Sequence, residues 1–248
     1  MSAARWPAAL GTALATLAIA ASPALAAPAC GPGRATATTV GAPAADVAWR
    51  ARLIARTPLA PAPDARGRGA ITPRQASWLL VLRARRDDDD RCRLRVRLPD
   101  RPNAAAAWID ADRVQLEPTP WRLTVSRAAR TLTVHRNGDR VRRFRVVVGA
   151  PGTPTPTGLF AILDVWRADP GAFLGAYVLP LTAHSRVLQE FGDGDGRVGL
   201  HGRGGASLRD PLGTAASHGC VRLDNRAIAW LVRAAGADRL AGVPVRVR

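Results

Sequence analysis

The chain has 248 residues, of which 47% are hydrophobic, so it can bury the core of one large domain or of two small ones. Its net charge of +17 is carried almost wholly by arginine. That charge predicts an anionic neighbourhood, such as a polymer, a membrane surface or nucleic acid, unless it is merely solvated. Aromatic residues make up only 5% and no nucleic-acid-binding module is recognisable, which argues against a nucleic-acid partner.

Residues 1–27 have the pattern of a secretory signal. Arg5 supplies a positive start, an apolar run of 14 residues covers 8–21, and Ala24-Leu25-Ala26 is the small-x-small pattern that precedes a cleavage point. The apolar run is short for a membrane span. We therefore expect export to the cell envelope, with an uncleaved membrane anchor as the alternative.

Two regions of different character follow. Residues 28–65 are rich in Ala, Pro, Thr and Arg and are expected to form an extended linker, in which 46–56 could fold as one short helix. Residues 66–118 are expected to form a small β module. The four aspartates at 87–90 are interpreted as the solvated tip of a hairpin. The strand signals are an apolar run at 78–82, a period-two stretch at 92–98 and a further strand at 108–114.

The order of strands and turns in 66–118 is similar to bacterial SH3-like modules. Such a likeness implies either binding of wall peptide, control of the approach to an active site, or a packing role.

The rest of the chain contains the clearest β pattern. Asn137-Gly138 marks a tight type I′ turn, and the proline density of 151–158 is typical of a rigid loop. A helix capped by Asp224 or Asn225 should bury one apolar face. One good helix among many strands predicts a mostly β domain, a barrel or sandwich flanked by short helices. Strands are expected over 122–126, 131–135, 141–148, 159–165, 177–182, 198–201 and 243–247.

A candidate catalytic site lies between Ser217 and Leu223, together with His201 from an earlier segment. Cysteine is the strongest nucleophile among the side chains, but only as the thiolate, so Cys220 needs a base within hydrogen-bond reach. His201 or His218 could be that base, and His201 is favoured because a separate segment can approach the sulfur from any direction. The backbone N–H groups of Gly219 and Cys220 are candidate donors to a developing oxyanion.

Cys220, His201 and His218 are also three potential zinc ligands. No acidic fourth ligand and no second cysteine lies close to them in the sequence, so we expect neither a metal nor another cofactor. Of the other histidines, His135 is expected at the surface, and His184 at most contacts a substrate. The glycine-rich stretch 192–196 is interpreted as a turn.

The arrangement as a whole resembles a known signature. His201-Gly202, the 15 residues from Gly202 through Ala216, and then Ser217-His218-Gly219-Cys220 resemble the motif of bacterial L,D-transpeptidases, which build cross-links in peptidoglycan. The resemblance covers roughly 119–248. It implies that region folds as an L,D-transpeptidase-type catalytic domain and acts as a metal-free thiol enzyme.

The resemblance also implies a two-step acyl transfer. Cys220 attacks a carbonyl in a peptidoglycan tetrapeptide stem, terminal D-Ala leaves with a proton from His201, and an amine of a second stem resolves the thioester. It implies a carbapenem adduct at Cys220. Arg222 would hold a carboxylate by its two-pronged fork, with an internal ion pair to Asp224 or Asp210 as the alternative. Support of the site falls to Gly202, Ser217, His218 and Gly219.

Three rival functions stay open. Water as the acceptor would make the protein an L,D-carboxypeptidase, and a site that has lost catalysis would leave a wall-binding protein. The third is a secreted cysteine peptidase acting on ordinary peptides. The arginine-rich surface predicts contact with an anionic cell-wall polymer.

The three cysteines predict one disulfide. If Cys220 must stay free, Cys30 and Cys92 are the only remaining pair in an oxidising compartment. A bridge between them would restrict the unfolded chain by about 4 kcal/mol in the loop-entropy description. The alternative is that both are unpaired.

Overall fold

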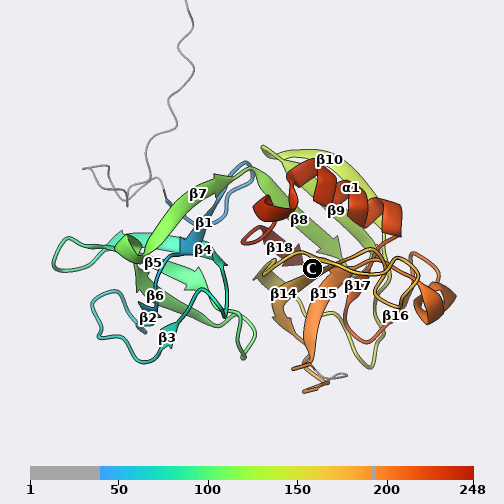
Figure 1. The fold of residues 1–248 in the computed structure, drawn as a ribbon, viewed down its shortest axis with the longest axis horizontal. Helices are drawn as coiled ribbons and strands as arrows, with labels where there is room; N and C mark the ends of the chain where they lie inside the picture. Colours follow the sequence, from blue (N-terminus) through green and yellow to red (C-terminus); the bar gives the residue numbers. More distant parts are fainter. Residues whose placement is uncertain (1–39, 191–193) are drawn as a thin grey trace, which may run out of the picture.

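The computed structural model describes residues 40–190 and 194–248, and in them the chain forms two β modules that lie side by side (Figure 1). The first module ends near residue 119 and the second begins near 121. The expected signal at 1–27 and Cys30 lie outside the described residues. Within the described ranges, no helix has both the length and the apolar character that crossing a membrane requires.

The first module is an antiparallel sheet with the strand order β6-β5-β4-β1-β7. The apolar run and the period-two stretch of the sequence form its neighbouring strands β4 and β5, as predicted. Beside the sheet, β2 (Thr57–Pro58) pairs with β3 (Ala70–Ile71). The strands of the sheet are β1 (Ala48–Leu53), β4 (Trp78–Arg86), β5 (Cys92–Arg97), β6 (Ala106–Asp110) and β7 (Val114–Thr119).

Two predictions in this module are wrong. Residues 46–56 do not form a helix in an extended linker. They contain β1, which pairs with β4 on one side and β7 on the other and buries Ala51 and Leu53. The strand expected over 108–114 is interrupted by the 3-10 turn Ala111–Arg113, which separates β6 from β7. The likeness to SH3-like modules stays a prediction.

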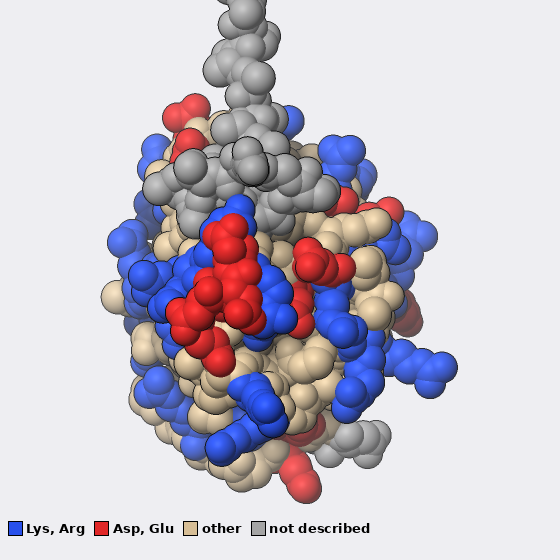
Figure 2. Space-filling model, turned by 90° about the vertical axis from the view of Figure 1, so that its left-hand side faces the viewer, with Lys and Arg blue, Asp and Glu red and all other residues tan. Residues whose placement is uncertain are grey.

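The hairpin tip between β4 and β5 forms as predicted. Asp87 is buried, and its carboxylate accepts hydrogen bonds from the backbone N–H groups of Asp89 and Arg91 at 3.1 and 2.8 Å. Figure 2 shows acidic side chains gathered on one face of this module with arginines around them. The aspartates of the tip therefore close the turn and pair with neighbouring arginines such as Arg91.

The second module has two larger open sheets and a two-stranded one, so the mostly β prediction is confirmed, and among its described strands no sheet closes into a barrel. The first sheet has the order β10-β9-β8-β18-β12, and β8 runs parallel to β18. Its strands are β8 (Trp121–Ser126), β9 (Thr131–Arg136), β10 (Asp139–Arg145), β12 (Gly158–Ala161) and β18 (Pro244–Val247).

The second sheet of this module, with the order β13-β14-β15-β17, carries the candidate site. Strands β15 and β17 run parallel, and Leu200 lies opposite Val221. A separate parallel pair joins β11 (Val148–Gly149) to β16 (Ala215–Ser217). The strands of the sheet are β13 (Trp166–Arg167), β14 (Tyr177–His184), β15 (Arg197–His201) and β17 (Val221–Arg222).

One hydrophobic core joins both sheets to the helix α1 (Asn225–Ala235). The helix begins and ends as predicted. The Asp224 carboxylate accepts the Arg226 N–H at 2.8 Å, and Gly236 follows the last turn with φ 83°. Its buried face includes Ile228 and Leu231. The core also includes Leu123, Val125, Leu132, Phe160, Leu179 and Leu200.

The turn at Asn137-Gly138 has φ angles of 52° and 88°, as a type I′ turn requires. The strand after it, β10, ends at Arg145 and not at the predicted 148, because Val148 leaves the sheet to pair with β16. Strand β12 also ends earlier than predicted, at Ala161 and not at 165. The proline-rich loop 151–158 lies between the ends of these shortened strands.

Arg50 is buried at the junction of the modules. Its Nη1 donates to the carbonyls of Asp238 and Ala241, both at 3.0 Å, and its Nη2 lies 2.7 Å from Glu117. The guanidinium also lies 4.0 Å from the ring centroid of Trp78. A side chain of the first module is thus bonded to the backbone of the second.

Candidate active site

A cavity of about 380 Å³ opens on the second sheet of the second module. It brings together four residues that the sequence analysis singled out: His201, His218, Cys220 and Arg222. The sequence neighbours of these lining residues, Gly202, Ser217 and Gly219, are all buried.

His201 stands at the end of β15 with 2% of its surface exposed. Its Nδ1 lies 2.7 Å from the carbonyl oxygen of Gly202. A carbonyl can only accept, so Nδ1 carries the proton and Nε2 holds the lone pair of the neutral ring. Burial lowers the pKa of His201 to about 4, opposed by the hydrogen bond to the Gly202 carbonyl and assisted by the charge of Arg222.

Gly202 is required by close packing. A Cβ atom there would lie 2.1 Å from Oδ1 of Asn225 and 2.9 Å from the backbone nitrogen of Ala176. The Gly202 N–H donates to the Tyr177 carbonyl at 3.1 Å, and the next peptide, whose oxygen contacts the His201 ring, is held through its Arg203 N–H by Asn225 Oδ1 at 3.1 Å. Gly202, which the sequence analysis named as a support of the site, thus contacts the His201 ring through its backbone carbonyl.

The sequence analysis interpreted Asn225 only as a possible helix cap and did not recognise it as a residue of the site. Its Oδ1 accepts the N–H groups of Ala176 and Arg203 at 3.0 and 3.1 Å. Its Nδ2 donates to the carbonyls of Arg203 and Pro170 at 2.8 and 3.0 Å. One amide therefore ties the segment after His201 to the loop that precedes β14.

The turn from Ser217 to Cys220 is held by the Ser217 hydroxyl. Its Oγ donates to the Cys220 carbonyl at 2.6 Å and accepts the Gly219 N–H at 3.1 Å. Gly219 has φ 123°, a conformation that L side chains rarely adopt. The Gly219 N–H, expected as an oxyanion donor, is instead directed to Ser217. The Ser217 carbonyl accepts from Ala150 N and Thr153 Oγ1, which docks the proline-rich loop.

Cys220 is half-buried and is a free thiol. Its Sγ accepts the Gly199 N–H at 3.5 Å, since Gly199 lies on the neighbouring strand β15. Burial raises the pKa of Cys220 above its ordinary value, and the Gly199 N–H and the charge of Arg222 lower it by less. Cys92, by contrast, is disulfide-bonded, and its expected partner, Cys30, lies outside the described residues.

Arg222 is buried and its Nη1 is paired with the carboxylate of Asp210, so the internal ion pair considered in the sequence analysis is present. Its guanidinium also lies 4.9 Å from the ring centroid of Phe173. Arg222 lines the cavity while it is held there by Asp210 and Phe173. His218 is exposed at the mouth of the same cavity.

Comparison with known proteins identifies the second module. The family model described as the YkuD L,D-transpeptidase catalytic domain matches residues 120–247, just over half of the chain. This protein belongs to the YkuD family.

Its relatives include the YkuD proteins of Bacillus subtilis and Bacillus licheniformis, each 33% identical over 107 residues. The match spans 43% of this chain and 56% and 55% of theirs, so it covers about half the length of these relatives.

Solved structures of L,D-transpeptidases are also similar. One from Enterococcus faecium is 20% identical with a TM-score of 0.38, over 52% of this chain and 49% of its own. One from Mycobacterium tuberculosis is 20% identical with a TM-score of 0.41, over 60% and 74%.

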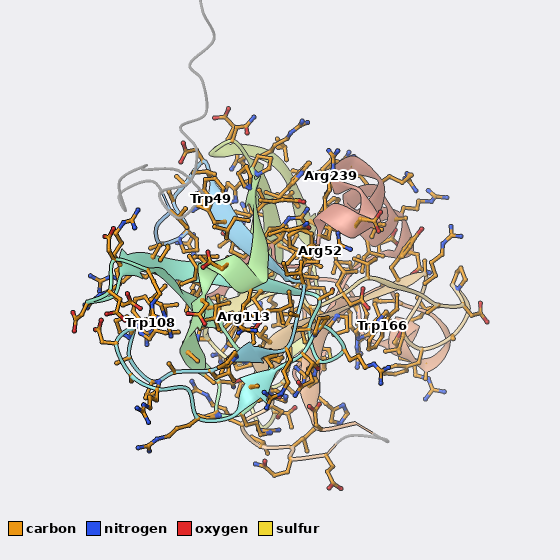
Figure 3. All side chains as sticks on the ribbon, turned by 60° about the vertical axis from the view of Figure 1, so that its left-hand side comes forward. Trp49, Arg52, Trp108, Arg113, Trp166 and Arg239 are labelled. Atoms are coloured by element: carbon orange, nitrogen blue, oxygen red, sulfur yellow. The ribbon has the colours of Figure 1, made fainter. Side chains whose placement is uncertain are left out.

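The YkuD domain of this chain has an apolar rim that the sequence analysis did not single out. Trp166, labelled in Figure 3, is 53% exposed, and Phe173 and Leu174 are 39% and 41% exposed. All three line the cavity, and the Phe173 ring centroid lies 6.2 Å from that of His201. Their signal in the sequence was only a cluster of apolar residues among glycines.

Another part of the cavity lining in the YkuD domain comes from Ser185, Leu188 and 194–197; we call it the outer wall. His184 lies beside it with 1% of its surface exposed, and its Nε2 is 3.0 Å from the Asp195 carboxylate. His184 therefore supports the wall and does not itself line the cavity.

His135 does not line the cavity, and it is half-buried where the sequence analysis expected a surface residue. It pairs with Arg122 across β8 and β9, and its Nδ1 is buried without a hydrogen-bond partner. In the described part of the chain, no group of three or more His, Cys, Asp or Glu side chains could hold a metal ion.

Proposed function

We propose that this protein is a cysteine L,D-transpeptidase that acts on peptidoglycan stem peptides, with Cys220 as nucleophile and His201 as base. The observation that carries the proposal is that the free thiol of Cys220 and the ring of His201 line one cavity, with Nδ1 of that ring held by the Gly202 carbonyl. Membership of the YkuD family supports the reaction class.

The electrostatics of the pair indicate when the proton moves. Burial raises the pKa of Cys220 and lowers the pKa of His201 to about 4, so both groups are neutral at rest near pH 7. Cys220 is thus not held as a thiolate before the substrate arrives, and it still needs the base that the sequence analysis called for. We infer that His201 takes the thiol proton as the sulfur attacks, which is general base catalysis.

The proposed reaction has two steps. In the first, Cys220 Sγ bonds to the stem carbonyl carbon, the bond from that carbon to the D-Ala nitrogen breaks, and the proton held by His201 passes to the departing amine. In the second, an amine of another stem attacks the thioester, the carbon–sulfur bond breaks, and a proton returns to sulfur. Water in place of the amine gives the carboxypeptidase alternative.

Mass spectrometry of purified residues 28–248 with tetrapeptide stems tests the proposal. The wild type should release D-Ala and form dimers, and Cys220→Ala should do neither. A carbapenem should add one drug mass at Cys220. Release of D-Ala without dimers would favour the carboxypeptidase, and no turnover and no adduct in a folded protein would favour a wall-binding protein. Turnover of ordinary peptides in place of stems would indicate the secreted peptidase.

Export and contact with an anionic wall polymer are further parts of the proposal. The edge strand β10 carries exposed arginines, Arg140, Arg142, Arg143 and Arg145, which supports the contact. Retention on cell-wall sacculi should fall as salt rises, because charge pairs at a surface are screened. Salt-independent retention would contradict it. The mass of the mature N-terminus in the culture fraction tests cleavage after the 1–27 signal.

A further inference from the structure

The outer wall of the cavity is fastened from the other module. Arg101, in the loop between β5 and β6 of the first module, donates from Nη1 to the Ser185 carbonyl at 2.9 Å. Its Nη2 donates to the carbonyls of Leu188 and Asp195 at 3.1 and 3.0 Å. Ser185, Leu188 and Asp195 all line the cavity, so one guanidinium holds three points of its wall.

Asn103 adds a second fastening two residues on. Its Oδ1 accepts the His184 N–H at 2.8 Å and its Nδ2 donates to the His184 carbonyl at 2.7 Å. The amide thus pairs with both backbone groups of His184, as a neighbouring strand would. In the reverse direction, Nη1 of Arg197 donates to the Pro99 carbonyl at 2.8 Å.

The wall held in this way carries charge. Asp195 accepts Nη2 of Arg197 at 2.7 Å and lies 3.0 Å from Nε2 of His184. A stem peptide presents carboxylate and amine groups, and the energy of such groups beside fixed charges depends steeply on distance. A shift of this wall, which ends at the first residue of β15, therefore changes how a charged peptide binds. His201 at the last residue of β15 and the turn of Cys220 are held separately, by the Gly202 carbonyl and the Ser217 hydroxyl.

We propose that Arg101 and Asn103 are positioning residues for the substrate cleft, so that the first module completes the binding site of the second. This inference rests on the proposed function for its substrate, the stem peptide. We expect these two side chains to affect substrate affinity and not the chemical step, because neither lines the cavity or touches the thiol.

The test uses the same purified protein with Arg101→Ala and Asn103→Ala, and Arg50→Ala as the matched control. Arg50 also donates to two carbonyls across the junction, yet none of its partners lines the cavity. We expect Arg101→Ala to raise KM for the stem about tenfold with kcat within about threefold, as loss of uniform binding does. Arg101→Lys should fall between, because an ammonium cannot span three carbonyls.

Two readouts separate positioning from general damage. The rate at which iodoacetamide alkylates Cys220 should be the same in all variants, and Arg50→Ala should lower Tm without changing KM. An unchanged KM in Arg101→Ala and Asn103→Ala, or an equal rise in Arg50→Ala, would overturn the proposal.

Amide hydrogen exchange supplies an arm that needs no turnover. Exchange at Ser185 and Leu188 should quicken in Arg101→Ala and not in Arg50→Ala. If the wild type released no D-Ala, the proposed function would fail, but hydrogen exchange would still test whether Arg101 holds the outer wall in place. Unchanged exchange would count against the fastening whatever the activity.

Discussion

The two walls of the cavity are held by different means. The inner wall, formed by the end of β15 and the turn from Ser217 to Cys220, is fixed within the second module by Asn225 and by the Ser217 hydroxyl. The outer wall depends on side chains that reach from the first module, above all Arg101. The wall that carries the proposed chemistry is thus held within its own module, and the wall proposed to position the substrate is held by both modules.

The largest expected effect breaks the inner wall. In Gly202→Ala the new Cβ would lie 2.1 Å from Asn225 Oδ1 and 2.9 Å from the backbone nitrogen of Ala176, so the backbone must move and take with it the carbonyl that contacts the His201 ring. We expect turnover of the stem to fall about 100-fold, because a small displacement of a catalytic group is costly. Steady-state kinetics measures the loss.

The matched control is Gly152→Ala in the proline-rich loop, where an added Cβ meets nothing within 4 Å. This variant should keep wild-type turnover. Near-normal turnover in Gly202→Ala would mean that the inner wall tolerates movement, and the contrast between the two walls would be lost.

The next effect is the pH dependence of the inner wall. The pKa of His201 is about 4 when folded against 6.5 when unfolded, so the unfolded chain binds a proton first as pH falls. The stability that the neutral buried ring contributes is therefore complete above pH 6.5 and is lost between 6.5 and about 4. The difference corresponds to about 3 kcal/mol of unfolding free energy.

Denaturant unfolding of the wild type and His201→Gln across this range measures the effect. The slope of stability against pH should be smaller in the variant, because glutamine does not titrate. His184, whose pKa burial also lowers, contributes in the same direction in both proteins and cancels in the comparison. Identical slopes would contradict the buried neutral ring. In the wild type, kcat/KM should hold down to about pH 4 and fall below it.

The same contrast explains what the sequence could predict. His201 and the turn from Ser217 to Cys220 could be singled out from the sequence, because the turn is contiguous and His201 ends a strand with a clear pattern, whereas Asn225 could not. The outer wall was not, because Arg101 and Asn103 lie in a loop whose own composition carries no signal. Their role follows from how two modules dock, which no local pattern encodes.

Misreadings elsewhere have the same origin. Residues 46–56 have a composition that a short helix tolerates, and only pairing with β4 and β7 makes them a strand. The Gly219 N–H was available for an oxyanion on sequence grounds, and the Ser217 hydroxyl two residues earlier takes it. In both places a tertiary or turn contact decided among conformations that the local sequence allowed.

The smallest expected effect separates two roles at the start of α1. Asn225 is the first residue of the helix, and its amide also holds the inner wall. Asp224→Ala removes only the cap that accepts the Arg226 N–H. We expect a loss of about 1 kcal/mol, or about 2–4 °C in Tm, with turnover unchanged. Asn225→Ala removes four hydrogen bonds to backbone groups around the site and should lower turnover as well as Tm.

Asp224→Asn serves as the conservative control, because asparagine caps as well as aspartate and should keep Tm near the wild-type value. Thermal unfolding and steady-state kinetics of the three variants separate the two roles. If Asp224→Ala lowered turnover as much as Asn225→Ala, the start of the helix, and not the amide of Asn225, would position the inner wall. If Asp224→Ala lowered Tm alone, the amide of Asn225 would be what holds the inner wall. The helix would then be weakened while the segment after His201 stayed where Asn225 holds it.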